Sequence, residues 1–262
     1  MLKAYVETFK KYQYLLANLI SRDLKVKYRR SVLGIMWSLL NPILMMLILG
    51  AVFKQLFNNY SVEHFELYLI TGQTLFTFFN EATSGGLESI VMSSALMKKV
   101  YVPKYVFPIE KVLYAFVNLC FSLTAVTIML FVFRVPFSVT MLLIPIPLFA
   151  LLLFTAGFSL LLSALYAFFR DTKHLYGVVL LAWMYLTPII YPLSMVENEP
   201  VIGTVVRLNP MTWFITAFRN LFLYSTLPDL KTVLICYIWG VVMVITGLVV
   251  FKKTQDRFVL HI

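Results

Sequence analysis

Five cations within nine residues form the densest charge cluster of this 262-residue chain: Arg22, Lys25, Lys27, Arg29 and Arg30. Lysine and arginine hold phosphate oxygens and acidic surfaces through charge-assisted hydrogen bonds. An uncharged stretch, residues 31–53, follows the cluster directly, and such cations gather on the cytoplasmic flank of membrane helices. The cluster therefore predicts a directed membrane insertion and contact with lipid phosphate or an acidic partner. The plainer alternative is that these charges only set the topology.

Two acidic residues in a largely apolar stretch are the next candidates for chemistry. Glu81 and Glu88 are seven residues apart and so share one face of a helix. Ionisable groups within membrane spans usually face the interior of a bundle or a cavity. A proton relay is one interpretation, and a position near the inner interface is the other, especially for Glu88.

Motifs for catalysis are missing from the sequence. There is no G-x-x-x-x-G-K-[ST] loop, so the chain is not expected to hydrolyse ATP in the Walker manner by itself. The three histidines are scattered, and no H-E-x-x-H motif or carboxylate cluster suggests a metal. The sequence therefore predicts neither a catalytic site nor a metal site, and the chain is not expected to be an enzyme.

The composition points to a membrane rather than to water. The chain is 61% hydrophobic and 13% charged, whereas soluble domains contain roughly 25% charged residues. The net charge of +10 comes from cations that lie between apolar stretches, not from a separate basic domain. We therefore expect an integral membrane protein that does not bind nucleic acid.

Six membrane helices are predicted from apolar stretches of about 20 residues. They cover about 32–53, 65–90, 112–133, 141–167, 175–191 and 232–251, and the second is the weakest because it carries three glutamates. With the N-terminus inside, all but five of the 22 Lys and Arg fall on the inner side; the five are Lys54, Arg134, Arg207, Arg219 and Lys231. This bias predicts that both termini are cytoplasmic.

The residues before the first span predict an amphipathic helix, residues 1–31, ahead of an all-α membrane domain, residues 32–262. Apolar residues recur at three- and four-residue spacing: Tyr5, Phe9, Tyr12, Leu16, Leu19 and Ile20. A helix with such a stripe and a basic face lies in the plane of the membrane interface.

Two segments between spans suggest moving parts. In the inner loop, Ser93 or Ser94 can cap a short basic helix, about 94–101, before Pro103 ends it. Such a helix is a lever for a cytoplasmic partner, although an ordinary basic loop fits the composition as well.

The outer segment, about 192–223, contains Asn209-Pro210, an N-cap followed by proline at the first helical position. The sequence predicts an apolar stripe through Trp213 and Phe218, with Thr212 and Arg219 on the opposite, polar face. A re-entrant hairpin that borders a pathway fits this pattern. A helix in the outer headgroups is the alternative.

Several short motifs, in order around six spans, resemble the membrane subunits of bacterial ABC-2 type exporters of lipid-linked polysaccharides, the O-antigen and teichoic-acid permeases. They are Arg22-Asp23, Tyr28–Gly34, Trp37, Asn41-Pro42, Lys98–Val100, Phe107-Pro108, Phe169–Asp171, Thr187–Pro192, Leu208–Pro210 and Arg219. Each motif is weak alone, and the resemblance rests on their order over nearly the whole chain.

The resemblance implies a homodimer bound to two copies of a separate ATPase, which would hold ATP and Mg, in the bacterial inner membrane. Its substrate would be a polysaccharide on a polyprenyl pyrophosphate carrier. The ATPase contacts would be Arg22, Asp23, Ser94, Met97, Lys98, Lys99 and Tyr101. The head group of the substrate would bind to Lys27, Arg29 and Arg30. The translocation path would include Trp37, Phe76, Phe79, Glu81 and Tyr185. The extracellular gate would include Asn209, Pro210, Trp213 and Arg219.

Three other functions remain open from the sequence. An ABC-2 exporter of drugs or small lipids would share the architecture and differ in cargo. A proton-coupled carrier would use Glu81 and Glu88 and need no ATPase. A membrane transferase for polyprenyl phosphate would need acidic metal-binding clusters, which the sequence lacks.

Overall fold

The computed structural model is built from helices, and it contains no strand within the residues that it describes, 2–29, 31–34, 36–53, 64–99, 102–196 and 199–260. The α-helices are α1 (Leu2–Tyr28), α2 (Met36–Phe53), α3 (Phe65–Met92), α4 (Ser94–Met97), α5 (Val106–Val132), α6 (Pro145–Phe168), α7 (Thr172–Tyr185), α8 (Pro200–Leu208), α9 (Pro210–Phe222) and α10 (Leu230–Thr254). Short 3-10 helices are η2 (Val139–Leu143), η3 (Leu193–Met195) and η4 (Gln255–Leu260). The all-α prediction is confirmed.

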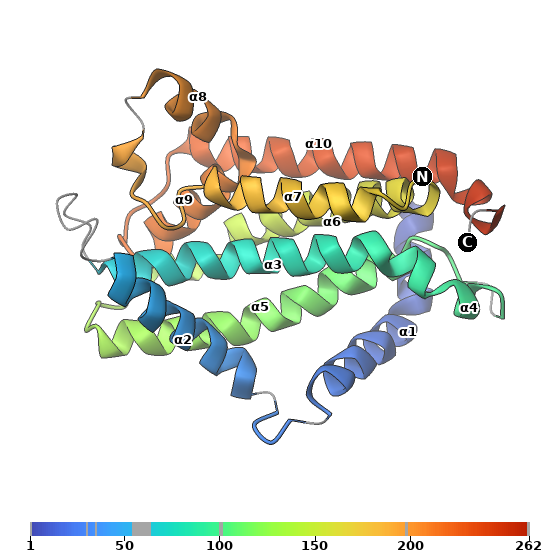
Figure 1. Ribbon diagram of the computed structural model, residues 1–262, viewed down its shortest axis with the longest axis horizontal. Coiled ribbons are helices and arrows are strands. Elements are labelled where there is room, and N and C mark those ends of the chain that lie inside the picture. Colours follow the sequence, from blue (N-terminus) through green and yellow to red (C-terminus); the bar gives the residue numbers. More distant parts are fainter. Residues whose placement is uncertain are drawn as a thin grey trace.

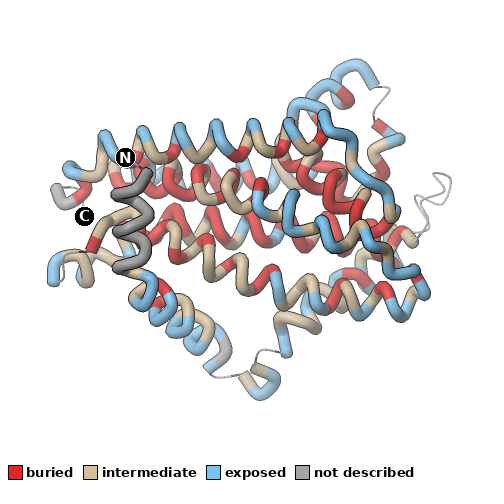
Figure 2. Tube along the Cα trace, turned by 180° about the vertical axis from the view of Figure 1, so that it is seen from behind, coloured by how far each residue is buried: buried red, intermediate tan, exposed pale blue. Residues whose placement is uncertain are grey.

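Five long helices, α3, α5, α6, α7 and α10, run alongside one another, and α1 and α2 form an open angle at one side (Figure 1). The two ends of the chain and α4 lie at one end of this bundle, and α8 and α9 lie at the other. Buried residues gather between the long helices (Figure 2), whereas Val32 and Leu33, between α1 and α2, are exposed. The fold thus has two distinct ends and one open side.

Four helical segments are long and apolar enough to cross a membrane: Met36–Phe53, Val106–Val132, Val139–Phe168 and Leu230–Phe258. The pair α8 and α9, bent by 77°, makes a fifth if it is counted as one broken span. These helices describe a multi-pass membrane protein with four or five candidate spans, against the six predicted.

Helix α3, the predicted second span, forms over the expected residues but is not among the apolar candidates. It lies in the centre of the bundle, where neighbouring helices cover most of its surface. Its buried hydroxyls donate to carbonyls of their own helix, as Thr71 does to Leu67 at 2.9 Å and Thr83 to Phe79 at 2.6 Å. Because its polar groups are satisfied internally, a central helix does not need an apolar surface.

Prolines shape the ends of two predicted spans. The predicted fifth span extends to residue 191, but α7 ends at Tyr185, since Pro188 disfavours helical backbone just before it. The predicted fourth span, 141–167, agrees with the candidate span Val139–Phe168, within which α6 begins with Pro145, the position at which proline suits a helix start. The segment before it forms η2.

An aromatic cluster and a close helix pair hold the bundle together. Phe79 of α3 packs against Phe154 and Phe158 of α6 and Trp183 of α7, with ring centroids 5.1–5.6 Å apart. Along the α6–α10 contact, a Cβ atom on Gly157 would stand 2.2 Å from the backbone of Met243. Small residues therefore let these two backbones touch, as in other membrane helix pairs.

Candidate functional site

A cleft of about 300 Å³ opens between α2, α3 and α5, beside the end of α1. Its apolar side is formed by Met45, Met46, Leu49, Leu69 and Ile70, and its polar side by residues that include Lys27, Gln73, Thr77, Glu81, Asn118 and Ser122. Trp37 also lines it and is 44% exposed. An amphipathic wall of this kind can contact both an apolar chain and a polar group on one ligand.

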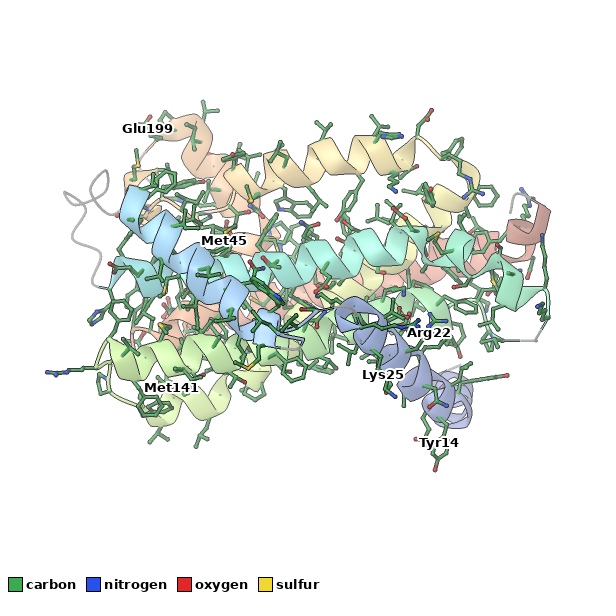
Figure 3. All side chains as sticks on the ribbon, turned by 60° about the horizontal axis from the view of Figure 1, so that its bottom comes forward. Tyr14, Arg22, Lys25, Met45, Met141 and Glu199 are labelled. Atoms are coloured by element: carbon green, nitrogen blue, oxygen red, sulfur yellow. The ribbon has the colours of Figure 1, made fainter. Side chains whose placement is uncertain are left out.

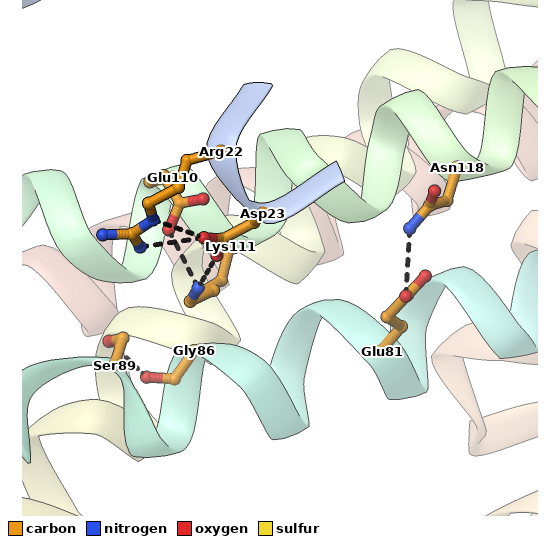
Figure 4. Close-up of polar contacts among 8 residues, drawn as sticks. All are labelled: Arg22, Asp23, Glu81, Gly86, Ser89, Glu110, Lys111 and Asn118. Carbon is orange, nitrogen blue, oxygen red and sulfur yellow. Dashed lines mark hydrogen bonds and ion pairs between the residues drawn. The ribbon is translucent and has the colours of Figure 1, made fainter. Parts of the chain in front are cut away.

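Three helices meet at the carboxylate of Glu81 on the polar side of the cleft. Oε1 of Glu81 accepts a hydrogen bond from Nζ of Lys27 on α1 at 2.9 Å. The same oxygen accepts one from Nδ2 of Asn118 on α5 at 3.0 Å, as Figure 4 shows. Glu88, by contrast, pairs with Lys173 at 2.5 Å, and it does not line the cleft. The two predicted acids therefore have separate partners, and only Glu81 belongs to the site.

A second charge cluster fastens α1 to α5, and its members are drawn in Figure 4. Asp23 accepts hydrogen bonds from Nε of Arg22 at 2.8 Å and from Lys111. Burial opposes ionisation of the Asp23 carboxyl, but these two donors outweigh it and lower its pKa below the ordinary value. Glu110 lies 3.3 Å from Lys111 and is almost fully buried, and its Oε1 has no partner within the described part of the chain.

The basic cluster at the end of α1 faces two ways. Arg22, Lys25 and Arg29 line an open hollow of about 540 Å³, and Figure 3 shows the first two projecting from α1. Lys27 points instead to the cleft and lies 5.7 Å from the ring of Tyr114. Arg30, the third predicted head-group residue, lies outside the described residues.

The inner loop contains a shorter helix than predicted. Helix α4 begins at Ser94 and ends at Met97, followed by a turn with Lys98 and Lys99 exposed. The Ser93 side chain makes no capping hydrogen bond, so the predicted side-chain cap is wrong. Tyr101, at the end of the predicted helix, lies outside the described residues.

The cap of α9 is confirmed and does more than start the helix. The side chain of Asn209 accepts from the backbone N–H of Met211 at 2.9 Å, with Pro210 at the first helical position. It also accepts from Nε1 of Trp183 at 2.7 Å and donates to the Thr187 hydroxyl at 2.8 Å. One amide thus ties α9 to the end of α7.

Arg219 and Thr212, predicted opposite the apolar stripe of α9, are buried. Arg219 is 3% exposed, and Thr212 is buried as well. The Arg219 guanidinium donates to the carbonyls of Tyr68 and Pro188, each at 2.8 Å, and to that of Ile189 at 3.3 Å. Backbone carbonyls therefore take the place of solvent, and the cation is buried without an acidic partner among the described residues.

The aromatic residues predicted for a path separate into three environments. Trp37 lines the cleft, Phe76 and Phe79 are buried in the core, and Tyr185 is 61% exposed at the end of α7. Trp213, predicted for the gate, donates to the Arg207 carbonyl at 2.7 Å and so ties α9 to α8. The cleft therefore brings together Lys27, Trp37 and Glu81 of the predicted residues, and it excludes Phe76 and Phe79.

Two residues of the site were missed by the sequence analysis. Asn118 stands in the middle of an uncharged span, and a lone amide there is a signal for an interior polar contact. In the sequence analysis, Lys111 was only one of the cations on the inner side of the membrane. Nothing in its local sequence indicates a contact with Asp23, 88 residues away.

A family match decides what kind of protein carries this bundle. The family model described as ABC-2 type transporter matches residues 14–223, which contain α2 to α9 and the cleft. The chain belongs to the ABC-2 type transporter family. Members of this family are transmembrane subunits and not the ATPase.

Curated relatives agree in name and extent. A Klebsiella pneumoniae protein named O-antigen export system permease protein RfbA is 30% identical over 246 residues, 93% of each chain. A second Klebsiella pneumoniae protein of that name is 31% identical over 245 residues, again 93% of each chain. One from Myxococcus xanthus is 28% identical over 249 residues, 94% of this chain and 95% of the relative. The resemblance stated from the motifs is thereby confirmed.

Proposed function

We propose that this ABC-2 permease is half of the channel of an ATP-driven exporter, which moves polysaccharide on a polyprenyl diphosphate carrier out across the bacterial inner membrane. The observation that carries the proposal is the similarity along 93% of the chain to permeases named for O-antigen export. The amphipathic cleft adds physical support, because it offers an apolar wall for a lipid chain beside Lys27, a cation for a phosphate group.

In this proposal the chain crosses the membrane six times, with α3 and the α7 region as the second and fifth spans and both termini in the cytoplasm. The distribution of Lys and Arg supports this orientation, as does the location of the termini and α4 at one end of the bundle. The opposite end, with α8 and α9, would then face outward. The bent pair would form the re-entrant gate, with Asn209, Pro210, Trp213 and Arg219 holding its shape.

Energy would come from a separate ATPase that binds ATP and Mg, with two copies serving a homodimer of this chain. Its contact surface would be α4 with Lys98 and Lys99, which are exposed, together with the Arg22-Asp23 region of α1. The hydrogen bond from Lys111 to Asp23 supports a role for α1 in coupling, because a push on α1 would reach α5 through it. Tyr101 stays a predicted contact.

The diphosphate would be gathered at the end of α1 by Lys27, Arg29 and Arg30. A charge-reversed variant tests this role: Arg29→Glu with Arg30→Glu should abolish stimulation of the ATPase by lipid-linked substrate while the complex still assembles. Substrate stimulation equal to wild type in an assembled complex would rule out the head-group role.

Export in cells tests the function as a whole. Deletion of the gene should stop surface display of one polysaccharide and leave its lipid-linked precursor inside, and the chain should copurify with a Walker-type ATPase. Normal surface polysaccharide together with sensitivity to drugs or small lipids would favour the alternative, an ABC-2 exporter with a small cargo.

A further inference from the structure

The Lys27–Glu81 ion pair closes the polar side of the cleft and joins residues 54 positions apart in the sequence. Its two side chains are 39% and 29% exposed, so water and dissolved ions reach them. A half-exposed pair contributes little to folding stability because solvent screens it. The pair can therefore open without unfolding its surroundings.

Glu81 keeps a partner when Lys27 leaves. Asn118 donates to the same carboxylate oxygen at 3.0 Å and comes from α5, a different helix from the one that carries Lys27. An acid that retains a hydrogen bond avoids much of the desolvation cost of an unpaired group. Another anion can then take the place of the carboxylate at Lys27.

Other cations of α1 can bind such an anion close to Lys27. Arg22, Lys25 and Arg29 share the face of the helix that lines the open hollow, and Lys27 lies on the opposite side, toward the cleft. An anion held at the hollow is thus one helix width from Lys27. The carboxylate of Glu81 is the group with which it must compete.

We propose that Glu81 is a built-in counter-ion of Lys27 that a lipid diphosphate displaces and that an ordinary phospholipid does not. A phosphodiester headgroup carries one negative charge and only matches the carboxylate it would replace. The bridging diphosphate of a lipid-linked glycan carries a negative charge on each of its two phosphates and offers more acceptor oxygens, so it wins the exchange. Glu81 therefore sets specificity by keeping abundant anionic lipids off Lys27. This inference rests on the proposed function, which supplies the diphosphate.

Binding of farnesyl diphosphate to the full-length chain in nanodiscs tests the exchange. Affinity is measured in discs of phosphatidylcholine and in discs with added phosphatidylglycerol, with inorganic pyrophosphate as the probe that lacks a lipid chain. The variants are Glu81→Gln, Glu81→Asp and, as a matched control, Glu88→Gln, whose acid lies on the same helix and pairs with Lys173 outside the cleft. Each must be monodisperse with a melting temperature near that of wild type.

Wild type and Glu88→Gln should bind the diphosphate with the same affinity in both kinds of disc. Glu81→Gln should bind more tightly in neutral discs and lose about fivefold in anionic discs, the scale expected of one lysine meeting an anionic membrane. Glu81→Asp, which keeps the charge, should behave like wild type. Weaker binding of pyrophosphate than of farnesyl diphosphate would assign the ligand to a lipid.

An equal response of wild type and Glu81→Gln to phosphatidylglycerol would overturn the counter-ion role while leaving export as proposed. Failure of every variant to bind farnesyl diphosphate would also overturn it. In that case the deletion strain separates the two ideas, because a loss of surface polysaccharide would still support the exporter.

Discussion

The guanidinium of Arg219 lies over the ring of Tyr68, 3.3 Å from its centroid, and donates to the backbone carbonyl of the same residue. This one side chain connects α9 to α3 and, through Pro188 and Ile189, to the end of the α7 region. Gly72 makes room for it, because a Cβ atom there would stand 2.6 Å from the guanidinium. The contact fixes the bent α8–α9 pair on the bundle.

Replacement of Arg219 by lysine should destabilise the protein although the charge is kept. One ammonium group cannot reproduce the planar fork that serves several carbonyls. At least one carbonyl is left without its donor, at a cost of about 1–3 kcal/mol. Thermal unfolding in detergent should show a lower melting temperature, and limited proteolysis should cut residues 186–210 sooner. An unchanged melting temperature would contradict the role assigned to the fork.

Asn209→Ala should loosen the junction between α7 and α9. The loss of an N-cap alone costs about 1 kcal/mol, and here the Trp183 and Thr187 contacts are lost with it. The expected result is a lower melting temperature together with a shift in the wavelength of tryptophan fluorescence emission. Asn220→Ala is the control, because the Asn220 side chain makes no hydrogen bond within the described part of the chain. Equal effects of the two changes would argue against the junction.

Gly157→Ala should destabilise the α6–α10 pair by about 1–3 kcal/mol, the usual cost of overpacking. The added methyl would meet backbone atoms of Met243, which cannot rotate away. Gly177→Ala in α7 is the matched control, since its Cβ atom meets nothing within 4 Å and alanine favours a helix. Melting temperatures of the two variants should move in opposite directions. A stable Gly157→Ala protein would show that the backbones can separate freely.

Acid should weaken the attachment of α1 through Asp23. The folded pKa of Asp23 is lowered, so its contribution to stability is fully present above the unfolded pKa, about 3.9, and disappears as pH falls toward the folded pKa. Melting temperatures measured between pH 6 and pH 3 should therefore fall more steeply for wild type than for Asp23→Asn. Parallel curves for the two proteins would mean that the carboxylate contributes no stability to the folded state.

Elements with local causes could be predicted from the sequence alone. Apolar stretches of span length become helices whatever packs against them, which is why residues 36–53, 106–132 and 230–254 form helices as expected. The cap at Asn209-Pro210 was predictable for the same reason, because its donors and acceptors lie within two residues. The resemblance to the family followed from the order of short motifs, and each motif can be recognised in the sequence without knowing its contacts in the fold.

The positions and partners of the polar side chains depend on contacts between distant parts of the chain. The helical pattern put Arg219 on the polar face of α9 but did not name its partners, which are backbone carbonyls of α3 and of residues 188–189 that accept its hydrogen bonds. Glu81 meets Lys27 and Asn118 across gaps of 54 and 37 residues, and no local rule selects those partners over others. Pairing of this kind depends on which helices become neighbours, a property that the packing of the whole bundle sets.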